Sequence, residues 1–371
     1  MKKCTGKWGL LFLLVAAMGL AACGGSDGDG PGEDVNPPQT GPGDNTDGPD
    51  GKTAVFARGA DVSWLTEMES QGRKFYDRNG NATECMALLK SLGINAIRLR
   101  VWVNPEGGWN AKDDVVAKAE RAHKLGLRVM VDFHYSDTWA DPGKQGIPAA
   151  WSGYDISKMK SAVAAHTKDV LQALKDRNVD VGWVQVGNET NNGMLWPTGQ
   201  ADKSMANYAA LTTAGYDASK TVYPDAKVIV HVSNGHKIDT FKWIFDGLKA
   251  NGGKWDVIGM SLYPDEDSSN NWYATNWSQQ AKDCLANVKT LASTYGTEVM
   301  VCEIGIRWDD PNAANFVKAM VNGAEAIDKC LGVFYWEPQC YGGWNGYNKG
   351  AFDNSGKPTQ AMFMFTPVIN E

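Results

Sequence analysis

The chain has 371 residues and a formal net charge of −7, with 43 acidic side chains against 36 basic ones. This acidic balance argues against binding to nucleic acid and against attraction to anionic lipid, and it suits a neutral substrate. The stretch after residue 52 has the length of one α/β barrel domain.

The first 22 residues have the pattern of a bacterial export signal. Lys2, Lys3 and Lys7 form a positively charged segment before a short apolar core over residues 10–20, which is too short to span a bilayer. The residues up to Cys23 read Leu-Ala-Ala-Cys and resemble a lipobox, so we expect a mature chain that starts at a lipidated Cys23. An ordinary secretory signal cut nearby is the alternative. Loss of the three lysines takes the net charge from −7 to −10.

Residues 23–52 are predicted to form a solvated tether. They consist mainly of Gly, Pro, Asp and Asn, and they cannot bury apolar surface. Acidic residues soon after the cysteine resemble the surface-export pattern of Bacteroides-type lipoproteins: Asp27, Asp29, Glu33 and Asp34. We therefore expect a lipid anchor in the outer membrane with the protein at the cell surface. A periplasm-facing anchor is the alternative.

Eight apolar runs of strand length alternate with stretches of helical periodicity in the rest of the chain. We predict strands over residues 55–64, 96–103, 128–135, 182–189, 227–234, 257–264, 298–305 and 332–338. We predict helices over residues 82–92, 113–125, 156–177, 202–222, 238–250, 277–295 and 313–329. This alternation predicts an α/β fold, a (β/α)₈ or TIM barrel, forming a single catalytic domain over residues 53–371. An open doubly wound sheet is the alternative, although no glycine-rich phosphate turn follows the first run.

Polar and aromatic side chains stand near the end of every predicted strand. They are Asp61, Trp64, Arg98, Arg100, Trp102, Asp132, His134, Asn188, Glu189, His231, Asn234, Tyr263, Glu303, Trp336 and Glu337. In a parallel barrel these strand ends meet at one rim, where such barrels build their active sites. Any one of them alone is explained as an ordinary surface or core residue, but their presence on all eight strands indicates a functional site.

Glu189 and Glu303 are the candidate catalytic pair. They end the fourth and seventh predicted strands, so only the fold brings them together across the barrel mouth. Two carboxylates are the minimum equipment for cleaving a glycosidic bond, and a separation of about 5 Å implies a retaining double displacement. Asn188, next to Glu189, is placed to orient a sugar hydroxyl. A structural salt-bridge network is the alternative explanation.

The surroundings of the two glutamates suggest different roles. We expect Arg98 or Arg100 and the Tyr263 hydroxyl to keep Glu303 ionised, as a nucleophile requires. Glu189, desolvated and close to that charge, should have a raised pKa and donate a proton. Strand alternation predicts that Cys302 points outward into the helix layer when Glu303 points into the mouth.

Tryptophan is unusually frequent, with 15 Trp against 12 Tyr and 11 Phe. Its flat apolar face and hydrogen-bonding edge suit a pyranose ring, and Trp139, Trp308 and Trp336 are the candidates for lining a cleft. His134 and Asp137 are candidates for binding sugar hydroxyls, with internal hydrogen bonding as the alternative. The expected substrate-binding residues are Asp61, Arg98, Arg100, His134, Asp137, Trp139, Asn188, Tyr263, Trp308 and Trp336.

We expect neither a metal nor a cofactor. The five histidines show no metal-binding spacing, and the seven cysteines contain no Cys-x-x-Cys pair. Five cysteines lie beyond Cys23, so at least one thiol stays free. Cys85 and Cys302 are expected to be buried, and a disulfide of Cys340 is left open.

Several motifs together resemble the glycoside hydrolases of family 53. They are residues 58–64 (Arg-Gly-Ala-Asp-Val-Ser-Trp), 97–105, 132–142, 187–189 (Gly-Asn-Glu), 195–197 (Leu-Trp-Pro) and 335–338 (Tyr-Trp-Glu-Pro). The resemblance runs from about residue 56 to the C-terminus. It implies a retaining (β/α)₈ endo-β-1,4-galactanase with Glu189 as acid/base and Glu303 as nucleophile. It also implies a substrate of β-1,4-linked galactose, as in type I arabinogalactan.

The sequence differs from the family pattern in one loop, and two alternative functions remain to be compared with the one that the resemblance implies. Bacterial members of the family often carry a calcium site in a long loop after the nucleophile, whereas residues 304–311 are short and lack the Asp/His cluster, so we expect no calcium. A mannanase or xylanase of the same clan is one alternative, which the loop over residues 137–142 disfavours. A non-catalytic surface glycan-binding protein is the other, which the two glutamates disfavour. We expect a monomer that acts on galactan.

Overall fold

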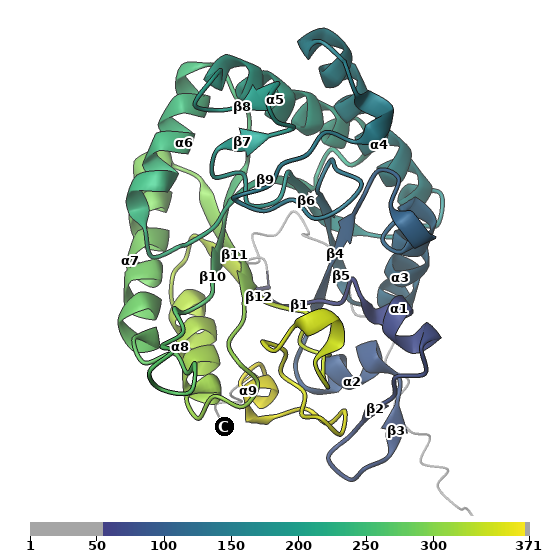
Figure 1. Ribbon diagram of the computed structural model, residues 1–371, viewed down its shortest axis with the longest axis vertical. Helices are drawn as coiled ribbons and strands as arrows, with labels where there is room; N and C mark the ends of the chain where they lie inside the picture. The colour runs from purple at the N-terminus through teal and green to yellow at the C-terminus, as the bar shows by residue number, and fades with distance from the viewer. Residues whose placement is uncertain (1–54, 368–371) are drawn as a thin grey trace, which may run out of the picture. The chain divides into compact units, whose positions relative to one another are not determined.

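Eight parallel strands close into a barrel at the centre of the fold (Figure 1). The computed structural model describes residues 55–367, so the predicted signal peptide and the whole predicted tether lie outside the described residues. In barrel order the strands are β1 (Ala57–Asp61), β4 (Ala96–Val101), β5 (Arg128–Phe133), β6 (Val181–Val186), β9 (Lys227–Val232), β10 (Val257–Leu262), β11 (Glu298–Ile304) and β12 (Cys330–Trp336). β12 returns to pair with β1, which closes the barrel and confirms the predicted fold.

Helices surround the strands in Figure 1 and connect most of them in turn. Within residues 55–367 they are α1 (Leu65–Ser70), α2 (Cys85–Ser91), α3 (Lys112–Lys124), α4 (Ile156–Lys175), α5 (Met205–Val222), α6 (Ile238–Ala250), α7 (Trp277–Tyr295), α8 (Ala313–Glu325) and α9 (Gln360–Phe363). The seven predicted helices are all present, with small differences at their ends. In the described part of the chain, no helix has both the length and the apolar content that a bilayer crossing requires.

The structure also contains short elements that the hydrophobic periodicity of the sequence did not predict. They are α1, α9, the hairpins β2 (Phe75–Tyr76) with β3 (Ala82–Thr83) and β7 (Gly193–Met194) with β8 (Gly199–Gln200), and the 3₁₀ turns η1 (Glu106–Gly108), η2 (Ala149–Trp151) and η3 (Trp344–Gly346). The helix predicted from residue 82 begins only at Cys85. Glu84 caps it by accepting a hydrogen bond from the Ala87 N–H, and the residues before it pair as a strand.

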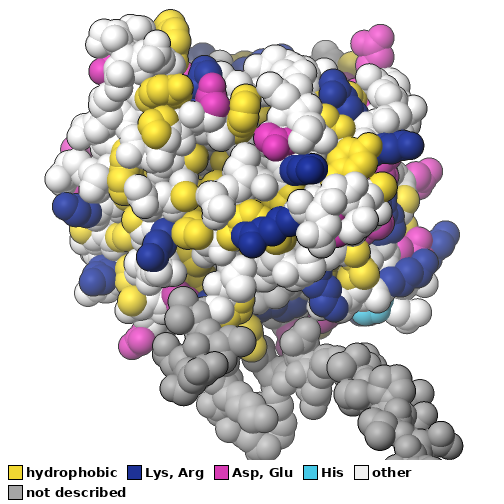
Figure 2. Space-filling view, turned by 90° about the horizontal axis from the view of Figure 1, so that it is seen from below, with side chains coloured by type: hydrophobic (Ala, Val, Ile, Leu, Met, Phe, Trp, Pro, Cys, Tyr) yellow, Lys and Arg dark blue, Asp and Glu magenta, His cyan; other side chains and the backbone are white. Residues whose placement is uncertain are grey.

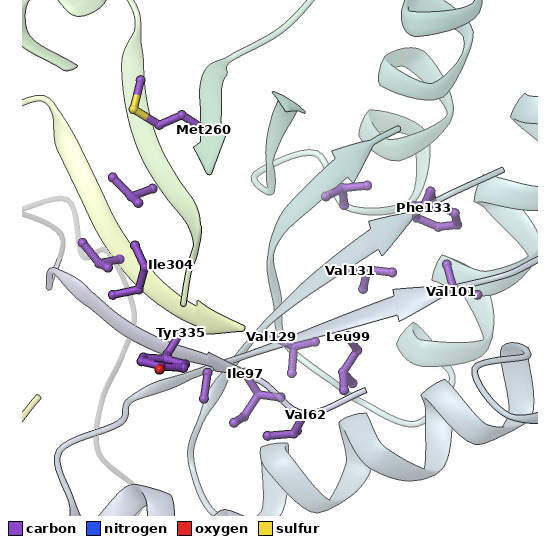
Figure 3. Close-up of a cluster of buried hydrophobic side chains, with 14 of the residues drawn as sticks. Val62, Ile97, Leu99, Val101, Val129, Val131, Phe133, Met260, Ile304 and Tyr335 are labelled. Carbon is purple, nitrogen blue, oxygen red and sulfur yellow. The ribbon is translucent and has the colours of Figure 1, made fainter. Parts of the chain in front are cut away.

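Alternation along the strands separates two apolar cores. Outward side chains such as Ile97, Leu99 and Val131 belong to the large core between barrel and helices, as Figure 3 shows for β4 and β5. Inward side chains form a plug to which every strand contributes: Ala57, Ala96, Met130, Trp183, Ile229, Val257, Met300, Cys302 and Phe334. The plug fills the lower barrel, so inward polar residues further along the strands gather at the carboxyl ends.

A β-bulge on β11 breaks this alternation at the point that matters for the site. Met260 pairs with Val301, but the next residue, Ser261, pairs with Glu303, so Cys302 is the extra residue. Cys302 lies in the inner plug, which makes the prediction that it points into the helix layer wrong. The bulge turns both Cys302 and Glu303 towards the interior of the barrel, because an extra residue shifts the pleat by one position.

Cys85, Cys284, Cys302, Cys330 and Cys340 are all free thiols and all buried. Burial of Cys85 and Cys302 was expected, and the structure shows no disulfide of Cys340. On the face seen in Figure 2, basic and acidic side chains are interspersed among scattered apolar ones, without a broad patch of one charge.

Candidate active site

Arg98 lies at the centre of the polar groups that fill the barrel mouth. From β4 its guanidinium contacts the carboxylates of Asp61 at 2.8 Å, Asp132 at 2.9 Å and Glu303 at 2.8 Å. Burial alone would lower the pKa of Arg98, but these three carboxylates raise it above its ordinary value. With its side chain only 1% exposed, Arg98 is a permanent positive charge shared by three strand ends.

Glu303 is held by two donors. Besides Arg98 on one carboxylate oxygen, the Tyr263 hydroxyl donates to the other oxygen at 2.7 Å. Both contacts match the expected neighbours, except that Arg100 takes no part. Glu303 is 4% exposed, so its carboxylate is fixed in a nearly dry setting with one side towards the mouth.

Glu189 follows β6 with a left-handed backbone, at φ 45°. That conformation is uncommon for a residue with a side chain, and such strain concentrates at functional sites. Ser261, which pairs with Glu303 across β10 and β11, donates its hydroxyl to Glu189 at 2.6 Å. One serine therefore touches the first glutamate and lies beside the second, which brings the two predicted catalytic residues together.

Burial raises the pKa of both carboxyl groups, that of Glu189 to about 7 and that of Glu303 to about 8. Arg98 and the Tyr263 hydroxyl both lower the pKa of Glu303, as expected of groups that favour its ionised form, but they do not bring it below its ordinary value. Arg98 divides its charge among three carboxylates, and burial together with the charge of Glu189 outweighs its effect on Glu303. The two carboxyl groups titrate as a pair, and the proposed chemistry needs the state in which the pair holds one proton.

The hydrogen-bond donors favour a location for that proton. The higher pKa of Glu303 taken alone would place the proton there. A full positive charge at 2.8 Å and a hydroxyl stabilise the ionised form of Glu303, however, whereas a single neutral hydroxyl reaches Glu189. Charge-assisted hydrogen bonds are about twice as strong as neutral ones, so the geometry favours the charge on Glu303 and the proton on Glu189.

Five aromatic rings form one cluster at the rim: Trp64, Trp102, Trp139, Trp336 and Tyr347. Neighbouring ring centroids are 4.7 to 6.0 Å apart, and Trp139 and Trp336 are partly exposed, as expected of residues that line a cleft. Trp308 is also partly exposed, on the loop after β11, but makes no ring contact with this cluster. The cluster can offer a flat apolar surface to a sugar ring.

Asp61 and Arg100, which we expected to bind substrate, are buried instead. Asp61 is 0% exposed and uses its carboxylate to hold Ser63 and Arg98. Arg100 pairs with Glu337 at 2.6 Å and lies 4.4 to 5.2 Å from three tryptophan ring centroids. The charged group of each is paired with a buried residue of the protein, so neither is free to contact a sugar.

Two further predicted binding residues, His134 and Asp137, make hydrogen bonds within the protein. His134 is 4% exposed, with Nε2 3.0 Å from Asp132 and Nδ1 accepting from the Trp102 indole N–H. Asp137 accepts backbone N–H groups on both carboxylate oxygens, from Asn104 and Ala149, which braces two loops. For Asp137 the structure thus favours the alternative of internal hydrogen bonding.

Gln185 and Ser261 are buried polar residues of the site that the sequence analysis did not single out, and His231 was named there only as a strand-end residue without a role. Gln185 bridges Arg98, Asp132 and His231 inside the barrel. A signal for each was present, because each is a polar residue within an apolar strand. Ser261 and Tyr263, two positions apart, share one face of β10 and its extension.

Within residues 55–367, no group of three or more His, Cys, Asp or Glu side chains is arranged so that it could hold a metal ion.

The part of the chain that carries the paired strand-end carboxylates matches a known protein family. The model of glycosyl hydrolase family 53 matches residues 57–315. The chain belongs to this family. Membership confirms the resemblance inferred from the motifs.

Relatives and solved structures similar to this family 53 chain match most of its length. A probable arabinogalactan endo-β-1,4-galactanase A of Neosartorya fischeri is 34% identical over 309 residues, which cover 76% of this chain and 83% of the relative. The endo-β-1,4-galactanase of Bacillus subtilis is 30% identical, covering 78% and 71%. A fungal β-1,4-galactanase structure superposes with a TM-score of 0.75 at 30% identity, covering 83% of this chain and 98% of the other. A family 53 catalytic domain of Ignisphaera aggregans gives 0.74 at 31% identity, covering 84% and 95%.

Proposed function

We propose that this protein hydrolyses internal β-1,4-galactosidic bonds of galactan with retention of configuration, using Glu303 as nucleophile and Glu189 as acid/base. The observation that carries the proposal is the unequal support of two adjacent carboxyl groups. Glu303 is held by Arg98 and Tyr263, whereas Glu189 meets only the Ser261 hydroxyl. One carboxyl group is thereby prepared to attack and the other to give up a proton.

In the first step Glu189 gives its proton to the oxygen that leaves, while a Glu303 oxygen bonds to the anomeric carbon and the glycosidic bond breaks. In the second step the Glu189 carboxylate takes a proton from water, whose oxygen displaces Glu303 from the same carbon. Tyr263 and Arg98 stabilise the carboxylate charge that disappears and returns in this cycle. The cluster around Trp139 and Trp336 supports the sugar ring.

Galactan is the proposed substrate because relatives from a bacterium and a fungus are named endo-β-1,4-galactanases and the chain spans most of their length. The test is to incubate the protein with linear β-1,4-galactan, mannan and xylan and to resolve the products. Internal cleavage of galactan alone is expected. Cleavage of mannan or xylan without galactan would overturn the assignment, and binding of galactan without cleavage would identify a glycan-binding protein.

Glu189→Gln and Glu303→Gln test the mechanism, with Glu298→Gln as the matched control. Glu298 lies on the same strand as Glu303 but at the opposite end of the barrel, where it pairs with Lys227. We expect a loss of at least a thousandfold in kcat for the first two variants and wild-type activity for the control. NMR of freshly formed products should show the β-anomer first; an α-anomer would exclude retention.

We further propose that the mature protein is a monomer held at the outer membrane, at the cell surface, by lipid on Cys23. The support is the export-signal pattern and the acidic tether in the sequence. Labelled palmitate should enter the wild-type protein but not Cys23→Ser, and protease added to whole cells should remove surface-exposed protein. Labelled Cys23→Ser would contradict the anchor, and protection in whole cells would indicate the periplasmic face.

A further inference from the structure

The backbone N–H of Glu189 indicates which ring nitrogen of His231 carries the hydrogen. The backbone N–H of Glu189 points at Nδ1 of His231, 3.4 Å away, and an N–H can only donate. The Gln185 amide nitrogen lies 3.0 Å from the same Nδ1. The Gln185 oxygen accepts from Arg98, which fixes that amide with its nitrogen towards His231. The Asn188 oxygen also lies 3.1 Å from Nδ1, but it already accepts a hydrogen bond from Arg98. The two donors that converge on Nδ1 therefore assign it the acceptor role, with no hydrogen of its own.

The hydrogen of His231 must then reside on Nε2. Burial, with Arg98 nearby, lowers the pKa of His231 well below its usual value, so the ring is neutral. Nε2 lies 2.7 Å from Ser261 Oγ, and its N–H donates there. The hydroxyl of Ser261 has a single hydrogen, which it donates to Oε1 of Glu189 at 2.6 Å. The direction of every hydrogen bond in this chain is thereby determined.

We propose that His231 and Ser261 are positioning residues that reserve one oxygen of Glu189, Oε1, as an acceptor and leave its acidic proton on Oε2. This inference rests on the proposed role of Glu189 as acid/base. His231 and Ser261 keep their own hydrogens throughout, and neither touches the sugar. After Glu189 has released its proton, the same hydroxyl stabilises the carboxylate that must next accept a proton from water.

The hydroxyl of Ser261 acts among several charged or titratable groups that face Glu189 from the surrounding strands and loops. They are Arg98 on β4, Asp132 on β5, Asp141 after β5, His231 on β9, Tyr263 after β10 and Glu303 on β11. Among the described residues, Ser261 is the one side chain that donates a hydrogen bond to the Glu189 carboxylate. Its removal therefore changes the direct support of Glu189 and leaves these groups in place.

The kinetic test compares Ser261→Ala with Ser219→Ala. Ser219 is equally buried but lies on α5, bonded to a carbonyl within its own helix. Loss of a donor to the carboxylate raises the pKa of Glu189, so the protonated acid persists to higher pH. We expect the basic limb of kcat/KM on galactan oligosaccharides to move up by about one pH unit in Ser261→Ala, and not to move in the control.

The leaving group separates positioning from general damage. On the oligosaccharide, kcat/KM of Ser261→Ala at its optimal pH should fall roughly tenfold, because the acidic proton of Glu189 is no longer held on Oε2. On a dinitrophenyl β-galactobioside, whose leaving group needs no proton, kcat/KM should stay within about twofold. Equal losses on both substrates with an unmoved basic limb would overturn the inference. His231→Gln, which keeps a side-chain N–H for Ser261, should retain more oligosaccharide activity than His231→Phe; equal losses would also overturn it.

An NMR measurement tests the chain without activity. In ¹⁵N-labelled protein, the His231 ring, assigned by the signal missing in His231→Gln, should carry its hydrogen on Nε2 from pH 6 to 8. A hydrogen on Nδ1 would refute the deduced chain even in an active enzyme. Failure to cleave galactan would instead refute the proposed function and leave this result standing.

Discussion

At the scale of single residues, Tyr263 offers a test of how Glu303 is kept ready. Its hydroxyl donates to Glu303 from just after β10, while Arg98 contacts the other oxygen from β4. Tyr263→Phe should reduce kcat/KM roughly tenfold to a hundredfold, because a hydrogen bond to a charged group is lost. The acid limb of the pH profile should also move up, since Glu303 must be ionised and loses a group that lowers its pKa.

Tyr216→Phe provides the control for this change. Tyr216 donates to Asp256 from α5, away from the catalytic rim, so its substitution should leave the pH profile unchanged. An unshifted acid limb in Tyr263→Phe would show that Tyr263 does not support the charge of Glu303.

Arg100 and Glu337 form a buried ion pair that the proposed chemistry does not use. Both side chains are at most 1% exposed, and Nε and Nη2 of Arg100 have no hydrogen-bond partner. At pH 8, where Glu337 with its pKa of about 7 is ionised, Glu337→Gln should lower the free energy of unfolding by about 3–5 kcal/mol, because it leaves an uncompensated buried charge. Arg100→Met combined with Glu337→Gln should cost less than the sum of the two single changes.

Urea unfolding measures this coupling, and the pair Arg58 and Glu325 serves as reference. Glu325 is 42% exposed, so Glu325→Gln should cost less than about 1 kcal/mol. Additive costs for the Arg100 and Glu337 variants would contradict the expected coupling.

At the scale of elements, the bulge on β11 shows how a strand places its catalytic side chain. A regular strand would send neighbouring residues to opposite faces, and the sequence offered no sign of an exception at Cys302. The exception arises because Ser261 on β10 pairs with Glu303 after Met260 has paired with Val301. Pairing between strands, which depends on the neighbouring strand, thus determined the direction of Glu303.

The closure of β1 against β12 depends on a glycine. A Cβ at Gly59 would overlap the ring of Phe334, which belongs to the inner plug. Gly59→Ala should therefore lower the free energy of unfolding by about 1–3 kcal/mol, and Phe334→Ala in the same chain should cost less than it does alone. Thermal unfolding of the two single variants and the double variant measures this; strictly additive losses would place the crowding elsewhere.

At the scale of the whole molecule, three buried carboxyl groups should make stability depend on pH. Burial raises the pKa of Glu189 to about 7, that of Glu303 to about 8 and that of Glu337 to about 7. A folded pKa above the unfolded one gives stability that is present at low pH and is lost as the pH rises through the folded value. Tm should fall by roughly 2–5 °C between pH 6.5 and 8.5.

Two further features define this experiment. Buried neutral histidines such as His166, whose pKa burial lowers to about 4, oppose the effect below pH 6.5, so the comparison belongs above that value. Glu303→Gln, which cannot ionise at that position, should show a smaller fall in Tm. A wild-type Tm that rises from pH 6.5 to 8.5 would show that these groups are not protonated in the folded protein.

The sequence by itself determined the number and order of the strands, the rim at which the chemistry lies and the two glutamates as candidates. These depend on local patterns, because apolar runs and their polar ends are set by residues a few positions apart. Only the tertiary structure decided that Arg98 serves Glu303 while Arg100 serves Glu337, and that His231 and Ser261 support Glu189. The partner of a buried charge depends on how eight strands are paired and closed, and residues far apart in the chain supply it.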